Sequence, residues 1–378
     1  MSLNKIARIL SIVQYYRSRL TEASRTALHT NANALRISAI QANAALRSAL
    51  TRVFLLGGGA LFIILFWRSG LDSIRFLILK IGWAFPFLFL PHVLVTIFEA
   101  SGWWFAFPPN ACRINKMEIL RFSVAAKAIQ HITPSISQGG ELLKFHLLRL
   151  GGTSADTSMA SVLAAKTTIA LGELLFISVG FAIVLHYIEL GWLTAISVTL
   201  GVLVMCLTVI GLLVWQRGGF FRLLVLAGRR FNVLTKFFNR HENFLSSTDS
   251  MLREYIGEGR RFWLSTLVYF FAWLAGALEA SVFLKLTGLP ADPISAVIVQ
   301  TWLVIVNRLT AFVPGNLGTH EAGAVMIFSF LGFSAEAAMG FALLRRVRQM
   351  FWIALGLGIL AKTPRAKDLW LFNDSSEA

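Results

Sequence analysis

The chain has 378 residues, of which 56% are hydrophobic and 14% charged, and a formal net charge of +16. A soluble domain carries about 25% charged residues, so this composition excludes an ordinary soluble protein and indicates a membrane protein. The basic residues lie beside apolar runs, where cytoplasmic loops collect Lys and Arg, and no nucleic-acid-binding motif accompanies them, so nucleic acid is not an expected partner.

The first 52 residues form a basic segment that holds eight Lys or Arg and a single acid, Glu22. Ile6, Leu10 and Val13 recur at helical spacing, which predicts an amphipathic helix on the membrane surface. A solvated helix and an organelle transit peptide are the alternatives. Residues 53–361 are predicted to form the transmembrane domain, and residues 362–378 a cytoplasmic tail.

Six apolar runs are predicted to cross the bilayer, whose hydrocarbon core is about 30 Å thick. These runs are Val53–Trp67, Phe76–Ala100, Met159–Tyr187, Trp192–Trp215, Phe262–Leu286 and Ala335–Ala361. The predicted fold class is therefore an all-α polytopic membrane protein. The basic connection at 216–261 is predicted to contain amphipathic helix on the membrane surface.

Two further apolar stretches, 122–150 and 294–332, are interrupted by proline and glycine. Basic residues assign both termini and the connections 101–121 and 216–261 to the cytoplasm, and the short neutral connections to the outside. This assignment requires each interrupted stretch to enter the membrane and to return to the face from which it came. We therefore predict two re-entrant hairpins that enter from opposite faces.

The two interruptions resemble each other. In each, a glutamate stands seven residues after a proline. A cation stands six or seven residues before the same proline: Lys127 in the first interruption and Arg308 in the second. Interrupted helices expose backbone N–H groups that protein, water or a ligand must satisfy, so the pattern predicts an inverted repeat with a substrate site at the hairpin tips. Two unrelated kinks are the alternative. The predicted tip residues are Pro134, Gly139, Gly140, Pro314, Gly315, Asn316 and Gly318.

Three arginines, Arg345, Arg346 and Arg348, lie inside the last apolar run. They cover about 160° of a helix, so they can share one face. Insertion of an arginine at the bilayer centre costs about 2.5–3.5 kcal/mol, so we expect this face to point to the protein interior and not to lipid. Glu141 and Glu321 are the expected counter-charges. The remaining positive charge, including that of Arg308, suits a lipid phosphate, whose oxygens a guanidinium binds in pairs. A structural Arg–Glu network and arginines that snorkel to an interface are the alternatives.

Lys166 and Glu173, seven residues apart on one helix face, are expected to form an ion pair, with a place in the substrate cavity as the alternative. His131 and His320 flank the interruptions and are secondary candidates for proton transfer. The sequence shows no metal-ligand spacing, catalytic triad or glycine-rich phosphate loop, so no catalytic residue, metal or cofactor is predicted.

The motif from Pro134 to Arg149, with Gly139-Gly140-Glu141, and the motif from Arg308 to Glu321 resemble the flippase-like family, also called the lysylphosphatidylglycerol synthase transmembrane region. Leu278-Glu279 and residues 343–348 resemble its subgroup encoded with hopanoid biosynthesis. The resemblance covers residues 53–361 and implies a multi-pass protein of the bacterial inner membrane, with both termini in the cytoplasm, that moves a modified phospholipid between leaflets. It places Glu141, Arg308 and Glu321 at the family's site.

After Ala361 the sequence shows no synthase domain, so aminoacylation of lipid is not expected. We therefore predict a lipid transporter, and not an enzyme, that binds an anionic head group at a midplane site between the hairpins. One alternative is an intramembrane enzyme acting on a lipid head group or polyprenyl phosphate, with Glu141 or Glu321 as general base. The other is a non-transporting scaffold whose partners are lipid-synthesis enzymes.

Overall fold

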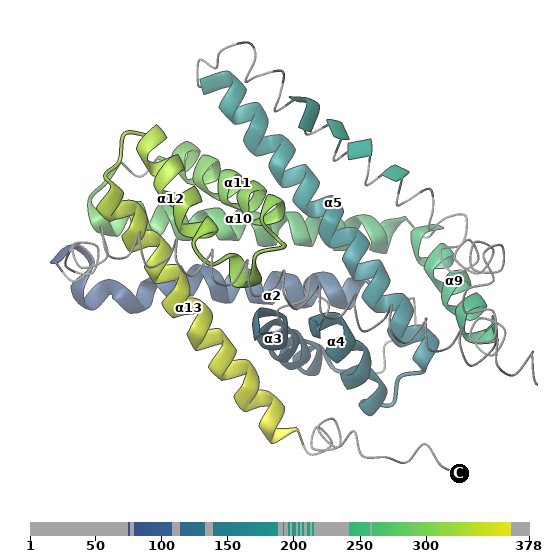
Figure 1. Cartoon of the computed structure of the whole chain (residues 1–378). Helices are drawn as coiled ribbons and strands as arrows, with labels where there is room; N and C mark the ends of the chain where they lie inside the picture. The colour runs from purple at the N-terminus through teal and green to yellow at the C-terminus, as the bar shows by residue number, and fades with distance from the viewer. Residues whose placement is uncertain are drawn as a thin grey trace, which may run out of the picture. The chain divides into compact units, whose positions relative to one another are not determined.

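The computed structural model describes residues 79–107, 114–132, 139–187, 242–257, 259–290 and 292–363, together with Arg75 and scattered positions between 192 and 214. All of these residues belong to one compact unit, Gly58–Ala378. The regular structure in these ranges is helical throughout, as the sequence predicts (Figure 1). The elements are η1 (Gly82–Phe89), α2 (Leu90–Phe105), α3 (Lys116–Ile132), α4 (Gly139–Leu150), α5 (Ala155–Tyr187), α9 (Glu242–Gly257), α10 (Arg260–Thr287), α11 (Pro293–Leu309), η2 (Pro314–Asn316), α12 (Thr319–Phe330) and α13 (Ala335–Lys362).

Three of the described helical segments are long and apolar enough to cross a membrane: Gly82–Phe105, Ala155–Tyr187 and Arg260–Thr287. They correspond to the runs predicted at 76–100, 159–187 and 262–286, with shifted ends. The first begins as 3-10 helix around Pro86, because proline removes a backbone donor there.

The structure does not establish the other three predicted runs as membrane crossings. Val53–Trp67 lies outside the described residues, and Trp192–Trp215 is described only at scattered positions. α13 occupies the last predicted run but carries three arginines, and α9 lies in the basic connection predicted at 216–261. Six crossings therefore stay a prediction.

A constant offset in residue number relates the second half of the chain to the first. α4 spans Gly139–Leu150 and α12 spans Thr319–Phe330, so both ends are shifted by the same amount. The same shift carries the first residue of α5, at position 155, onto the first residue of α13, at position 335. The turns before these two helices correspond as well, since Gly152 and Gly332 have φ values of 85° and 78°. The units α2–α5 and α10–α13 are thus two copies of one four-helix pattern, and the repeat extends well beyond the proline–glutamate spacing.

Equivalent serines begin α5 and α13. Ser154 Oγ accepts a hydrogen bond from the backbone N–H of Thr157 at 3.4 Å, and Ser334 Oγ accepts one from Ala337 at 3.3 Å. A side-chain oxygen at this position satisfies one of the N–H groups that the first helical turn leaves free. The same local sequence signal therefore starts the long helix of each unit.

α11 and α12 form an antiparallel pair, and we call it the second hairpin. Trp302 Nε1 donates to the carbonyl oxygen of Gly323 at 3.0 Å, while Thr319 and Thr310 bond across the turn at 3.1 Å. α3 and α4 also pack together, through Ala125, Leu143 and Leu147, and we call them the first hairpin. Residues 133–138, which include Pro134, lie outside the described residues.

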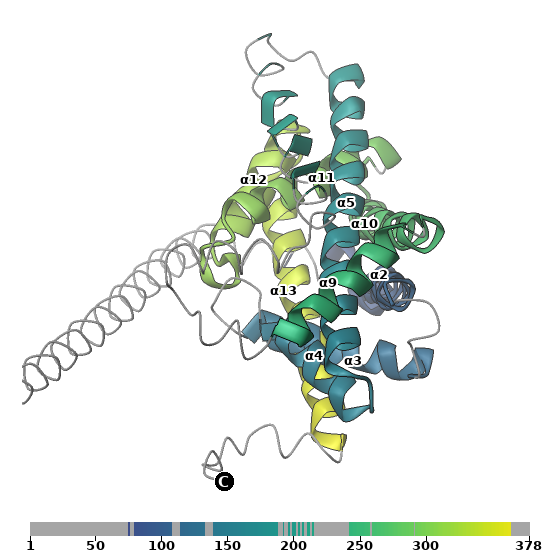
Figure 2. The same cartoon turned by 90° about the vertical axis from the view of Figure 1, so that its right-hand side faces the viewer.

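The long helices α5 and α13 run in opposite directions, as Figures 1 and 2 show. α5 packs on α4, α10 and α11, whereas α13 packs on α3 and α12. Each long helix therefore contacts its own hairpin and the first helix of the other hairpin. α2 packs along α10 between the two units.

Small residues allow this close packing. A methyl group on Gly356 of α13 would lie 2.5 Å from Cβ of Ala128 and 2.7 Å from the carbonyl oxygen of Val124, both on α3. Since backbones approach closely only where side chains are small, Gly356 sets the distance between α13 and the first hairpin.

We expect Gly356→Ala to lower the free energy of unfolding by about 1–3 kcal/mol, because the added methyl group forces α13 away from α3. Gly358→Ala is the matched control: it lies on the same helix with nothing within 4 Å of the new methyl group. Alanine is intrinsically the better helix former by about 1 kcal/mol, so the control should be neutral or stabilising. Thermal unfolding of the purified protein in detergent measures both. Equal melting temperatures for the two variants would contradict the close approach.

Candidate functional site

The turn of the second hairpin is built from residues that tolerate a left-handed backbone. Gly315, Asn316 and Gly318 have φ values of 63°, 49° and 79°, in the region that glycine and asparagine adopt more readily than other residues. Asn316 Nδ2 donates to the backbone oxygen of Asn307 at 3.1 Å and to its side-chain oxygen at 2.9 Å. The predicted tip residues 314–316 and 318 therefore form a turn that is fastened to α11.

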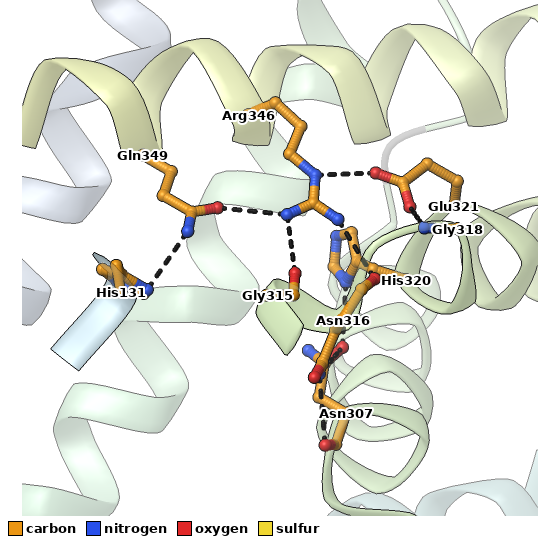
Figure 3. Close-up of polar contacts among 9 residues, drawn as sticks. All are labelled: His131, Asn307, Gly315, Asn316, Gly318, His320, Glu321, Arg346 and Gln349. Atoms are coloured by element: carbon orange, nitrogen blue, oxygen red, sulfur yellow. Dashed lines mark hydrogen bonds and ion pairs between the residues drawn. The ribbon is translucent and has the colours of Figure 1, made fainter. Parts of the chain in front are cut away.

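Arg346 of α13 holds this turn from the opposite side (Figure 3). Its Nε donates to Oε1 of Glu321 at 2.7 Å, and its two terminal nitrogens donate to the carbonyl oxygens of Gly315 and Asn316 at 2.8 and 3.1 Å. The other oxygen of Glu321 accepts from the backbone N–H of Gly318 at 2.8 Å. Glu321 is fully buried, so its charge is balanced entirely by these donors.

The same contacts reach the first hairpin. Arg346 Nη1 lies 3.4 Å from Oε1 of Gln349, and Gln349 Nε2 lies 3.2 Å from Nδ1 of His131 at the end of α3 (Figure 3). On the other side of the turn, His320 Nδ1 lies 3.1 Å from Oδ1 of Asn307. α13 therefore joins the tip of the second hairpin to the end of the first helix of the first hairpin.

A second ion-pair group lies deeper in the bundle. Glu279 of α10 is 2% exposed and pairs with Arg345 Nε at 3.3 Å and with Arg348. Arg345 also donates to Oε1 of Gln300 at 2.6 Å. All three arginines of α13 thus face the interior, as predicted, but their counter-charges are Glu279 and Glu321 and not Glu141.

α5 carries one ion pair to each hairpin. Lys166 Nζ lies 3.5 Å from Oε1 of Glu141 on α4, and Glu173 receives both Nε (2.5 Å) and Nη2 of Arg308 on α11. The expectation that Lys166 and Glu173 pair with each other is wrong, because two different hairpins supply their partners. The side chain of Arg308 is 56% exposed and that of Glu173 8%, so this pair lies at the edge of the packed region.

The two long helices use equivalent positions. The offset that relates α4 to α12 also carries Lys166 onto Arg346, and it carries their partner Glu141 onto Glu321. Both glutamates are the third residue of the second helix in their hairpin, where a carboxylate is favoured by the N-terminal helix dipole. The structure thereby forms two related ion pairs, Lys166–Glu141 at the first hairpin and Arg346–Glu321 at the second, while Arg345 and Arg348 lie apart on Glu279.

At the first hairpin, Lys127 pairs with Glu99 of α2 at 2.6 Å, and the ammonium of Lys144 lies 4.8 Å from the ring centroid of Trp103. The sequence reasoning did not select the following contact residues as site residues: Glu99, Lys144, Glu279, Gln300, Asn307 and Gln349. Glu279 had a usable signal, since a single acid inside an apolar run is expensive and marks a buried partner or a functional site. The uncharged amides gave no such signal. Within the described part of the chain, no three His, Cys, Asp or Glu residues gather as metal ligands would.

We expect Glu279→Gln to lower the free energy of unfolding by about 3–5 kcal/mol, because it leaves Arg345 and Arg348 without their anion in a buried position. Glu118→Gln, at an exposed position of α3, is the control with the same chemical change and should be neutral. Thermal unfolding in detergent is the measurement. Two variants of equal stability would show that Glu279 does not balance these arginines.

No curated protein and no solved structure matches this chain. A family model does match it: residues 44–358 fit the lysylphosphatidylglycerol synthase TM region. This match covers most of the chain and includes both hairpins, α5, all but the last residues of α13, and every ion pair described above. It agrees with the resemblance carried by the two proline–glutamate motifs, and it connects the protein with membrane lipid. The chain therefore belongs to the lysylphosphatidylglycerol synthase TM region family.

Proposed function

We propose that the protein is a lipid translocase that binds an anionic head group between two re-entrant hairpins and moves it between leaflets. The observation that carries the proposal is the convergence of both hairpins on α13 through Arg346, Gln349 and His131 (Figure 3). The opposite directions of α5 and α13 support an inverted repeat, the architecture in which transporters place substrate sites where broken helices meet.

The arginines divide into two groups in this proposal. Arg345 and Arg348 share the buried Glu279 and form the fixed base of the site. Arg308 and Arg346 each hold one carboxylate near a hairpin tip, where a head-group phosphate could share or replace it. An empty site then stays charge-balanced, which matters because an unpaired arginine near the bilayer centre costs about 2.5–3.5 kcal/mol.

One observation favours a second candidate function, that of a scaffold for lipid-synthesis enzymes. Each of the four arginines already has a carboxylate partner, as a purely structural network would require. An intramembrane enzyme with Glu141 or Glu321 as base is the third reading. Mass spectrometry of labelled lipids after incubation identifies an enzyme, because only an enzyme alters the lipid. A leaflet-accessibility assay on the same proteoliposomes then separates a translocase, which changes the leaflet of the lipid, from a scaffold, which does not.

The proposed topology predicts which positions face the same side of the membrane. In a variant with Cys112 and Cys206 replaced, single cysteines at Lys116 and Arg149, which flank the first hairpin, should react with an impermeant maleimide from the cytoplasmic face only. Single cysteines at Lys285 and Ala335, which flank the second hairpin, should react from the outside only. If Lys116 and Arg149 label from opposite faces, the first hairpin crosses the membrane and is not re-entrant.

We expect Arg346→Lys to reduce lipid translocation at least tenfold while the protein stays folded. Lysine keeps the charge opposite Glu321, but a single ammonium does not reproduce the planar fork that reaches Glu321, Gly315 and Asn316 together. Fluorescent-lipid accessibility in proteoliposomes measures translocation, and thermal unfolding checks the fold.

Glu321→Gln should have the same effect, because it removes the anion that orients Arg346. Arg121→Lys, at an exposed position of α3, is the control and should translocate lipid at the wild-type rate. If Arg346→Lys and Glu321→Gln both translocate lipid at the wild-type rate, the turn of the second hairpin has no part in translocation.

A further inference from the structure

Five charged residues gather around the first hairpin, and we call them the lysine cluster: Glu99 (α2), Lys127 (α3), Glu141 and Lys144 (α4), and Lys166 (α5). Lys127 Nζ bonds both carboxylate oxygens of Glu99, at 2.7 and 2.6 Å, and Lys166 Nζ lies 3.5 Å from Oε1 of Glu141. Lys144 interacts electrostatically with the other four charges, and Tyr269 of α10 lies within electrostatic range of both glutamates. Two of the three lysines therefore have a carboxylate partner of their own.

Lys144 is the lysine of this cluster without such a partner. Among the described residues it has no carboxylate at ion-pair distance, and its Nζ lies 4.8 Å from the ring centroid of the buried Trp103. An aromatic ring stabilises a cation only partly, and burial favours the neutral form of a lysine. The cluster holds three cations and two anions when Lys144 is charged, and two of each when Lys144 has lost a proton.

The second unit shows that the fold does not require a charge at this position. The offset that relates α4 to α12 carries Lys144 onto Ala324, which is fully buried in the apolar core. The three arginines of α13 each contact a carboxylate, and arginine keeps its proton in proteins. Lysine loses its proton far more readily when buried. The first unit therefore differs from the second by a cation that can change its charge.

Glu141 offers a charged Lys144 a second place to bind. Its Oε2 is buried and has no hydrogen-bond partner in the described part of the chain. Residues three apart on a helix are neighbours on its surface, so the side chain of Lys144 can turn from Trp103 towards this oxygen. An ammonium there would supply the donor that the buried acceptor lacks. Lys144 thus has one suitable environment for each protonation state.

We propose that Lys144 takes up and releases one proton in each transport cycle, and that this exchange couples lipid translocation to a proton gradient. On uptake, a proton from water binds the electron pair of Nζ, and the ammonium donates to Oε2 of Glu141. On release, one N–H bond breaks, the electron pair stays on Nζ, and the proton passes to water. The proposal rests on the lipid translocase proposed above and identifies the ion gradient that drives it.

Proteoliposomes with a pH gradient across the membrane test the coupling. The probe is whichever of fluorescent phosphatidylglycerol and phosphatidylserine the wild type moves; it is added to the outer leaflet, while valinomycin and potassium hold the membrane potential at zero. With one proton for each lipid, a gradient of one pH unit should shift the final ratio of probe between the leaflets about tenfold. Reversal of the gradient should reverse the shift.

Two variants fix the charge of Lys144 in opposite states. Lys144→Met is always neutral and Lys144→Arg always charged, so neither can exchange a proton, and in both the final ratio should not respond to the gradient. A purely electrostatic role would instead be restored by Lys144→Arg. Lys285→Met, at an exposed position of α10, is the control and should respond as the wild type does. A response retained by either Lys144 variant would overturn the proposal.

Competitive labelling of the wild type in detergent stands where a variant does not fold. Acetic anhydride reacts with neutral amines only, and peptide mass spectrometry measures the labelling of Lys144 as a function of pH. We expect half-maximal labelling about two pH units below that of a lysine amide standard in the same sample, because burial favours the neutral form. Equal midpoints for Lys144 and the standard would overturn the proposal.

The two measurements separate this proposal from the translocase. Lipid movement by the wild type that does not respond to the pH gradient would refute the coupling and leave the translocase standing. If the wild type moves no probe although Lys144 labels at low pH, the translocase is wrong and with it the coupling, while proton exchange at Lys144 stands.

Discussion

Pairing of buried charge is the constraint on which the rest of this structure depends. A helical bundle in an apolar environment cannot hold Arg345, Arg346 and Arg348 unless each meets an anion within a few ångströms. Glu279 and Glu321 meet them from α10 and α12, so the pairs fix how α13 sits against both helices. The close approach of Gly356 to α3 then sets the distance to the first hairpin. Electrostatic pairing and backbone packing together position the turn of the second hairpin and the end of α3 against α13.

The sequence was sufficient for the helical class, for three long apolar segments and for the resemblance of the two hairpins, because apolar length and proline–glycine interruptions are local signals. The sequence was also sufficient to predict that the three arginines of α13 face the protein interior. One of their partners, Glu321, was expected from the sequence, whereas Glu279 was not. Lys166 and Glu173 share a helix face, yet Lys166 pairs with Glu141 and Glu173 pairs with Arg308. The choice of partner depends on which helices pack together, and residue spacing along one helix does not reveal that packing. Gln300 and Gln349 were missed because an uncharged amide looks the same in a solvated loop and in a buried network.

The internal repeat makes differences between the hairpins interpretable. Equivalent helices begin at equivalent positions in the two units, so the partners of equivalent residues can be compared directly. Glu99 and Glu279 are equivalent acids, but one receives a single lysine and the other two arginines. Glu279 is paired with arginine, which binds several acceptors in fixed directions, whereas Glu99 is paired with lysine, which offers a point charge on a flexible stem.

The two hairpins also differ in how many of their donors and acceptors are already paired within the protein. Arg346 donates hydrogen bonds to Glu321 and to two carbonyl oxygens in the turn of the second hairpin. Any ligand that binds Arg346 must therefore displace bonds that already hold this turn. At the first hairpin, Lys166 makes one long contact, Lys144 faces an aromatic ring, and one oxygen of Glu141 has no donor among the described residues. In the proposed translocase, a head group would have fewer protein bonds to displace at the first hairpin than at the second. A transporter must release its cargo as well as hold it, and exchange is easiest where the protein's own bonds are fewest. Under the proposed function, head-group binding should therefore begin at the first hairpin, and the second hairpin with Arg346 should form the more rigid side of the site.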